Sequence, residues 1–168
     1  EIGLQENALL RPRGYAVQLR VNMESMQRDG TTRPTSGTLS AFEPPAGPGV
    51  RVDSFGYAGY RTSPAFDSLL AKVIAHSSSE NFTDVVQRAY RALCEFRIEG
   101  VATNIGFLQN LLCNPGVEAN EVDTTFIERH ANELAASDSG HPRLFAQPAT
   151  SQPAKTALAG ARIDTSDP

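Results

Sequence analysis

An arginine inside a segment of alternating side chains is the first feature of this chain that could do chemistry. Arg20 lies in residues 14–24, where apolar and polar side chains alternate as in a half-buried β-strand. Its guanidinium is permanently charged and can donate two parallel hydrogen bonds to an anion. The pattern alone favours a solvated sheet face, because antiparallel sheets commonly expose one side to water. The apolar row is Tyr15, Val17, Leu19, Val21 and Met23, and the polar row is Ala16, Gln18, Arg20, Asn22 and Glu24.

Other strands are expected to position this segment. Short stretches in which apolar residues alternate with polar ones, or follow one another without a break, are typical of strands, as are short aromatic stretches. Gly and Pro between such stretches are typical of tight connections. The Pro- and Gly-rich stretch 44–49 predicts a stiff loop, because proline restricts φ and glycine permits positive φ. The strands expected after this first one lie at 37–42, 50–54, 55–60 and 69–75.

The second half of the chain changes to a helical period. Apolar residues predict a helix at 82–96, with Asn81 as N-cap and Gly100 just past its end. A shorter helix is expected at 104–112, and the capping-box spacing of Thr125 and Glu128 indicates the start of another. Strands followed by helices predict an α+β fold with a mostly antiparallel β-sheet and a few packed helices.

The last part of the chain has a different composition. From residue 135 to 168, Ala, Ser, Thr, Gln and Pro dominate and no periodicity remains. Such a stretch has too little apolar surface to offset its chain entropy, so we expect an interdomain linker with Leu144 and Phe145 as a local anchor. The predicted organisation is therefore one domain at 1–134 and a linker at 135–168.

Bulk composition excludes several classes of function. The 168 residues carry a net charge of −4 and show no basic cluster, so no nucleic-acid partner is expected. No apolar run approaches the roughly 20 residues of a membrane span, and the first residues do not form a signal peptide. Because the sequence does not begin with Met, we interpret it as a piece of a longer chain.

Cysteine and histidine spacing offers no metal site. Cys94 and Cys113 are far apart in sequence and are predicted to be reduced, buried thiols. The three histidines, His76, His130 and His141, are scattered without the spacing of zinc ligands, so no metal is expected.

The remaining candidates have structural explanations that we favour. No nucleophile elbow, P-loop or dinucleotide motif is present, and the glycines at 47, 49, 56 and 59 are expected in turns and strand packing. Asp67 and Lys72 could form an ion pair, but a lysine that reaches water from an edge strand is favoured. Tyr57 and Tyr60 could stack on a ligand, but core packing is favoured.

Six segments nevertheless occur in the order and spacing of one family. Together they make residues 2–134 resemble the C-terminal domain of biotin carboxylase, the ATP-grasp component of biotin-dependent carboxylases of the acyl-CoA or pyruvate carboxylase type. The segments are R-G-Y-A-V-Q-L-R-V-N at 13–22, P-A-G-P-G-V-R-V-D-S at 45–54, Y-A-G-Y at 57–60, F-D-S-L-L-A-K at 66–72, F-R-I-E-G-V-A-T-N at 96–104 and D-T-T-F-I at 123–127.

The resemblance implies a reaction and a role for Arg20. Enzymes of this family use ATP and Mg²⁺ to activate bicarbonate as carboxyphosphate, and the carbon then passes to N1 of biotin on a carrier domain. The ATP- and metal-binding residues lie in an upstream ATP-grasp domain, so this fragment alone is expected to bind no cofactor and to be inactive. Arg20 matches the family arginine that holds bicarbonate and stabilises the oxyanion of enolised biotin.

The resemblance also implies partners and an assembly. Arg51 matches an arginine of the bacterial dimer interface, whereas Pro48 replaces a bulky residue there, and the connection at 24–37 is longer than usual. Expected partners are the ATP-grasp domain, the biotin carrier domain, a carboxyltransferase and further copies of the chain. The expected location is cytoplasmic, or the mitochondrial matrix in a eukaryote. The alternative is a non-catalytic assembly module that keeps the scaffold and uses the Arg51 face.

Overall fold

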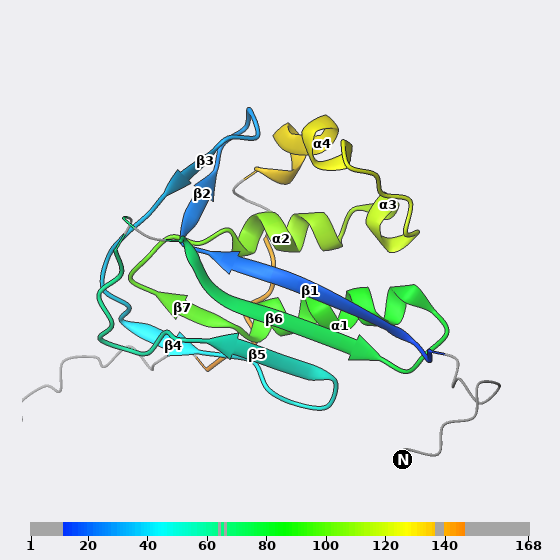
Figure 1. Cartoon of the computed structure of the whole chain (residues 1–168), viewed down its shortest axis with the longest axis horizontal. Helices are drawn as coiled ribbons and strands as arrows, with labels where there is room; N and C mark the ends of the chain where they lie inside the picture. Colours follow the sequence, from blue (N-terminus) through cyan, green and yellow to red (C-terminus); the bar gives the residue numbers. More distant parts are fainter. Residues whose placement is uncertain (1–11, 64, 66, 137–139, 147–168) are drawn as a thin grey trace, which may run out of the picture.

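A computed structural model describes residues 12–63, 65, 67–136 and 140–146. These residues form an α+β fold with antiparallel sheets, which confirms the predicted class (Figure 1). The strands are β1 (Tyr15–Asn22), β2 (Glu24–Met26), β3 (Thr32–Pro34), β4 (Ala41–Glu43), β5 (Val50–Ser54), β6 (Leu69–Ser77) and β7 (Arg97–Glu99). The helices are α1 (Phe82–Glu95), α2 (Ile105–Leu112), α3 (Pro115–Glu118) and α4 (Phe126–Leu134).

The main sheet has three strands in the order β1–β6–β5. Its central strand pairs Lys72 with Arg20 on one side and with Asp53 on the other. The predicted alternation of β1 is confirmed, because Leu19 and Val21 are buried while Arg20 between them is exposed. Two smaller sheets pair β2 with β3 and β4 with β7.

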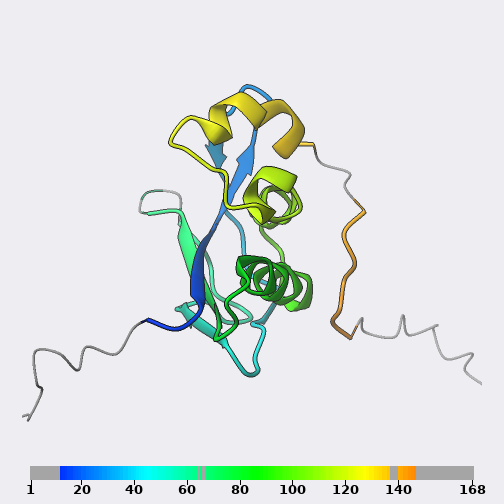
Figure 2. The same cartoon turned by 90° about the vertical axis from the view of Figure 1, so that its right-hand side faces the viewer.

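Helix α1 covers the apolar face of the main sheet. Asn81 caps it as predicted, since its side chain accepts a hydrogen bond from the Thr83 amide at 3.2 Å. Val85, Val86 and Leu93 point into a core shared with the sheet. Figure 2 shows α1 and α2 side by side on one side of β1 and β6. The other face of the sheet carries no helix within the described residues.

Two expected strands differ from those observed, and one observed strand was not expected. Residues 55–60 form a turn instead of a strand, with the Tyr60 amide donating to the Tyr57 carbonyl at 3.0 Å. The 37–42 strand is reduced to β4 and an isolated bridge between Thr38 and Arg61. The short strand β7 was missed, so Gly100, with φ of +93°, ends β7 rather than α1. β7 pairs with β4, and Thr38 pairs with Arg61, so the partners of these short elements are remote in sequence and a local pattern does not reveal them.

Helix α4 is present where predicted, but its capping box is not. The Thr125 side chain makes no capping hydrogen bond to the helix. Asp123 instead accepts hydrogen bonds from the Thr125 amide and hydroxyl, both at 2.9 Å. These bonds lower the pKa of Asp123. The carboxylate therefore closes the turn that leads into the helix.

Residues 140–146 lie against α1 and α2 within the predicted linker. The Leu144 amide donates to the Cys94 carbonyl at 2.8 Å, but its side chain is 53% exposed. The expected anchor at 144–145 therefore makes a backbone contact. The predicted boundary between residues 134 and 135 stays a prediction, and the rest of the linker lies largely outside the described residues. Cys94 is a buried free thiol as predicted, whereas Cys113 is exposed.

His141 attaches this segment to both helices. The Asn110 side-chain amide donates to the Leu134 and Ala136 carbonyls, so its Oδ1 must accept the hydrogen bond shared with His141 Nε2 at 2.8 Å. Because Nε2 donates, Nδ1 of the neutral ring accepts from the Tyr90 hydroxyl at 3.0 Å. The contacts therefore fit a neutral imidazole.

We expect this histidine to make stability depend on pH. Burial lowers the pKa of His141 from its ordinary value of 6.5, so the unfolded chain binds more protons near that pH. The free energy of unfolding should therefore fall as pH drops below about 6.5. Urea unfolding between about pH 7.5 and 5.5 measures this slope, and His141→Gln should flatten it. An unchanged slope in that variant would contradict the assignment.

Candidate functional site

Arg20 lies on the sheet face opposite α1. We call this surface the Arg20 face and define it by Gln18, Arg20, Lys72, Ile74, Arg51 and Asp53, which occupy matching outward positions on the three strands. The Arg20 side chain is 51% exposed. Its carbonyl points away from β6, so Arg20 and Lys72 form a non-hydrogen-bonded pair, in which side chains approach closely. Two cations therefore lie side by side on an open surface.

Asp67 is the acidic partner of Arg20. Arg20 Nη2 donates to Asp67 Oδ2 at 3.4 Å, and the carboxylate is oriented by the Leu69 amide, which donates to Oδ1 at 3.0 Å. Asp67 therefore pairs with Arg20 and not with Lys72, the pairing that the sequence had left open. The favoured prediction of Lys72 on an edge strand is wrong, because Lys72 lies in the central strand β6. An exposed ion pair contributes about 0–1 kcal/mol, so an external anion can compete with Asp67 for the guanidinium.

Asn22 and Glu24, two of the predicted polar residues of the first strand, form a network beside Arg20. Asn22 Nδ2 donates to Glu24 Oε1 at 2.9 Å, and the Ser68 hydroxyl donates to Glu24 Oε2 at 3.3 Å. Among the described residues, Asn22 Oδ1 is the one buried side-chain oxygen or nitrogen without a partner. The sequence placed these residues on one face, and the structure connects them through the loop before β6.

Asn104 was missed as a member of this site. It was expected only at the start of a helix, yet its side chain binds the backbone of β1 at Arg20 and Asn22. A buried asparagine between a strand and a helix, in the F-R-I-E-G-V-A-T-N segment, is the only signal that the sequence offers.

The two residues predicted at a dimer interface are both exposed. Arg51 Nε and Nη2 donate to the two carboxylate oxygens of Asp53 at 2.8 and 3.0 Å. These hydrogen bonds hold the pKa of Asp53 below its usual range, with a smaller contribution from Lys72. Pro48 lies on the loop before β5. The structure is of a single chain, so the role of both residues stays a prediction.

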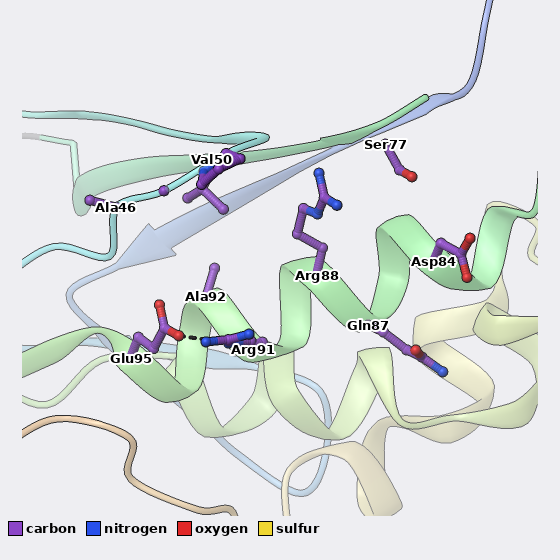
Figure 3. Close-up of a pocket in the computed structure, with 11 residues that line it drawn as sticks. Ala46, Val50, Ser77, Asp84, Gln87, Arg88, Arg91, Ala92 and Glu95 are labelled. Carbon is purple, nitrogen blue, oxygen red and sulfur yellow. Dashed lines mark hydrogen bonds and ion pairs between the residues drawn. The ribbon is translucent and has the colours of Figure 1, made fainter. Parts of the chain in front are cut away.

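Pro48 also borders a hollow between its loop and α1 (Figure 3). The hollow has a volume of about 490 Å³, and Arg88 projects across it to donate to the His76 carbonyl at 2.6 Å. Gly49 has a φ of +76°, and a Cβ there would collide with the Arg88 guanidinium and the His76 carbonyl. This glycine therefore serves packing, as expected. Arg20 is not part of the hollow.

The tyrosines of the Y-A-G-Y segment do not pack as expected. Tyr57 is 61% exposed, and Phe55 beside it is 51% exposed. Both rings meet Tyr60 edge to face, with centroids 5.4 and 5.5 Å away. The prediction of core packing is wrong for Tyr57, because residues 55–60 turn at the surface instead of continuing as a strand.

Metal ligands and membrane spans can be assessed over the described ranges. Those residues contain no group of three or more His, Cys, Asp or Glu that could hold a metal ion. None of the helices found there has the length and hydropathy needed to cross a bilayer.

Comparison of the sequence with known protein families identifies the family of this chain. Residues 18–129 match the biotin carboxylase C-terminal domain, a span that begins within β1 and ends within α4. The chain belongs to this family.

A curated relative of this biotin carboxylase C-terminal domain is human mitochondrial pyruvate carboxylase. The two are 42% identical over 132 residues, which is 77% of this chain and 11% of the relative. The chain also covers only 25% of a biotin carboxylase from Nostoc sp. (strain PCC 7120), to which it is 39% identical over 69% of its own length. It therefore corresponds to a small part of the relatives that it matches.

Solved structures show the same fold. A single-chain, multi-domain long-chain acyl-CoA carboxylase aligns with a TM-score of 0.70 at 50% identity, covering 74% of this chain and 12% of that one. The biotin carboxylase domain dimer of the Hydrogenobacter thermophilus 2-oxoglutarate carboxylase aligns with a TM-score of 0.67 at 30% identity, covering 74% and 27%. That structure is a complex with MgADP, ADP and bicarbonate.

Proposed function

We propose that this domain serves the biotin carboxylase component of a multidomain biotin-dependent carboxylase. In this proposal the complete enzyme carboxylates carrier-bound biotin with bicarbonate and ATP. The observation that carries the proposal is the half-exposed guanidinium of Arg20, which lies on an uncovered sheet face within the segment that matches the family. The complex of a related domain dimer with bicarbonate supports an anionic substrate.

Arg20 would act as a hydrogen-bond donor to two successive anions. Bicarbonate first replaces the Asp67 carboxylate at the guanidinium, which costs little because the ion pair is exposed. The same donor then stabilises the oxygen of the biotin ureido group as negative charge develops on it. Lys72, directly opposite in the sheet, adds positive potential to this surface. Asp67 would pair loosely with the guanidinium until the anion arrives.

The rest of the machinery is assigned to other parts of the enzyme. We place ATP and Mg²⁺ in the upstream ATP-grasp domain, as the family resemblance implies. The biotin carrier domain and a carboxyltransferase domain or subunit are the other proposed partners. The acceptor, an acyl-CoA or pyruvate, would be selected by the carboxyltransferase. We expect cytoplasmic localisation, or the mitochondrial matrix in a eukaryote, by analogy with the human relative.

Dimerisation through the Arg51 region is part of the same proposal. A related biotin carboxylase domain forms a dimer. Arg51 is exposed at the edge strand β5, with its guanidinium held by Asp53. In a dimer these groups could exchange their internal ion pair for contacts with a second copy.

The division of labour predicts that the 168-residue chain is inactive alone. The purified chain should cleave no ATP in response to bicarbonate, whereas the complete carboxylase should do so under the same conditions. Phosphate release with and without bicarbonate measures this, and free biotin can be added as the acceptor. Bicarbonate-dependent ATP cleavage by the purified chain would show that the nucleotide site lies within it.

A further inference from the structure

Asn104 is an unusual N-cap residue. It precedes α2, where an asparagine side chain ordinarily accepts a hydrogen bond from the first turn of the helix. The Asn104 side chain makes no such bond. It is only 7% exposed, and its amide points to the free edge of β1.

Three hydrogen bonds join Asn104 to the strand at Arg20. Its Oδ1 accepts from the Asn22 amide at 2.9 Å, and its Nδ2 donates to the Arg20 carbonyl at 3.1 Å. Its own backbone amide donates to the Asn22 carbonyl at 3.1 Å. β1 is an edge strand of the sheet, so these backbone groups have no strand partner on that side. Asn104 therefore takes the place of a neighbouring strand.

These three hydrogen bonds, which we call the clamp, lie where the pairing of β1 with β6 becomes irregular. The pairing with β6 is regular through Arg20 and Val21, but the register shifts between Val21 and Asn22. Past Val21 the chain is therefore no longer held by a regular ladder, although the Met23 amide donates to the Ser68 carbonyl at 2.7 Å. The one side-chain bond that Arg20 makes within the described residues is its ion pair with Asp67, which is long and exposed. The position of the guanidinium must depend on the backbone from which it projects.

We propose that Asn104 is a positioning residue for Arg20, which anchors the end of β1 to the start of α2 so that the guanidinium meets its anion in a fixed place. This inference rests on the proposed function. Asn104 itself need not touch the substrate, because a small displacement of a catalytic group is enough to reduce the rate.

The first experiment tests the clamp in the 168-residue chain. Asn104→Ala removes both side-chain bonds, so hydrogen exchange of the Asn22 amide, followed by NMR, should become about tenfold faster. Asn110→Ala is the matched control, since Asn110 also binds two backbone carbonyls but lies away from Arg20. That control should leave the Asn22 amide unchanged. Equal exchange in Asn104→Ala and the unmodified chain would overturn the proposal.

The second experiment asks whether the clamp acts through Arg20. In the complete carboxylase, Asn104→Ala should raise the KM for bicarbonate about fivefold or more and leave the KM for ATP unchanged. In a double-mutant cycle, the same change should have little further effect once Arg20→Lys is present. Asn110→Ala should change neither KM. If Asn104 only stabilised the fold, Asn104→Ala would lower the amount of active enzyme and leave both the KM for bicarbonate and the KM for ATP unchanged.

The outcomes separate this inference from the proposed function. If Arg20→Lys alone leaves turnover and both KM values unchanged, the proposed function has failed, and this inference fails with it. If Arg20→Lys is impaired but the effects of Asn104→Ala are additive or absent, the positioning role alone is wrong. Should Asn104→Ala not fold, Asn104→Asp keeps the acceptor for the Asn22 amide and loses the donor to Arg20. It should then raise the KM for bicarbonate above that of the unmodified enzyme, and an unchanged KM would overturn the inference.

Discussion

Replacement of Arg20 with lysine is expected to lower biotin carboxylation by the complete enzyme at least about a hundredfold, as does the loss of one oxyanion donor in other enzymes. Lysine keeps the charge, but it replaces a rigid, planar fork by a flexible ammonium group with a different geometry. An anion that receives two parallel hydrogen bonds from arginine would lose one of them. The steady-state rate of carboxybiotin formation at saturating ATP and bicarbonate measures the effect.

The control for this substitution is Arg91→Lys. Arg91 is an exposed arginine of α1 with an ion pair to Glu95, and it lies on the other side of the sheet. Its replacement should leave carboxylation unchanged. Neither variant should unfold measurably earlier than the unmodified protein, since the Arg20 side chain is half exposed, the Arg91 side chain is largely exposed, and exposed ion pairs contribute little to stability. Normal turnover by Arg20→Lys would remove Arg20 from the mechanism and favour the alternative of an assembly module based on the Arg51 face.

The largest effect on stability is expected from Leu93→Ala. Leu93 is 1% exposed and lies in the core between α1 and the sheet. Truncation removes buried methyl groups and leaves a cavity that the close-packed surroundings fill only partly. The free energy of unfolding should fall by about 2–5 kcal/mol, which is a large fraction of the total for a domain of this size.

Urea unfolding followed by circular dichroism measures this loss. The matched control is Gln87→Ala on the exposed side of the same helix, where alanine is an equally good helix former or better. That variant should stay within about 0.5 kcal/mol of the unmodified chain. A loss below about 1 kcal/mol in Leu93→Ala would mean that the α1 face is less tightly packed than the burial of Leu93 indicates.

Local patterns were sufficient for the elements with strong periodicity. The period of two in β1 placed Leu19 inside and Arg20 outside, because successive strand residues point to opposite faces. The apolar residues that set the helical period at 82–96 include Val85, Val86 and Leu93, and all three are buried in α1. These properties follow from the geometry of a single segment, so they do not require knowledge of its partners.

Short and irregular elements could not be predicted in the same way. Residues 55–60 have the aromatic and glycine composition of a strand, but they form a turn that leaves Tyr57 exposed. β7 has only three residues and exists because it pairs with β4, more than 50 positions earlier in the chain. Such elements are defined by tertiary pairing rather than by intrinsic preference.

The sequence alone determined the fold class, the strand that carries Arg20 and the side of the sheet to which its guanidinium points. Only the tertiary structure decided which groups surround that guanidinium. Asp67 pairs with Arg20 across 47 positions of the chain, and Asn104 binds its backbone across 84. Periodicity describes neighbours within one turn or strand, whereas these contacts arise when the loop before β6 and the start of α2 fold against β1. The sequence therefore predicted the position of the Arg20 charge on the outer face of β1. It did not predict the contacts with Asp67 and Asn104 that surround this residue.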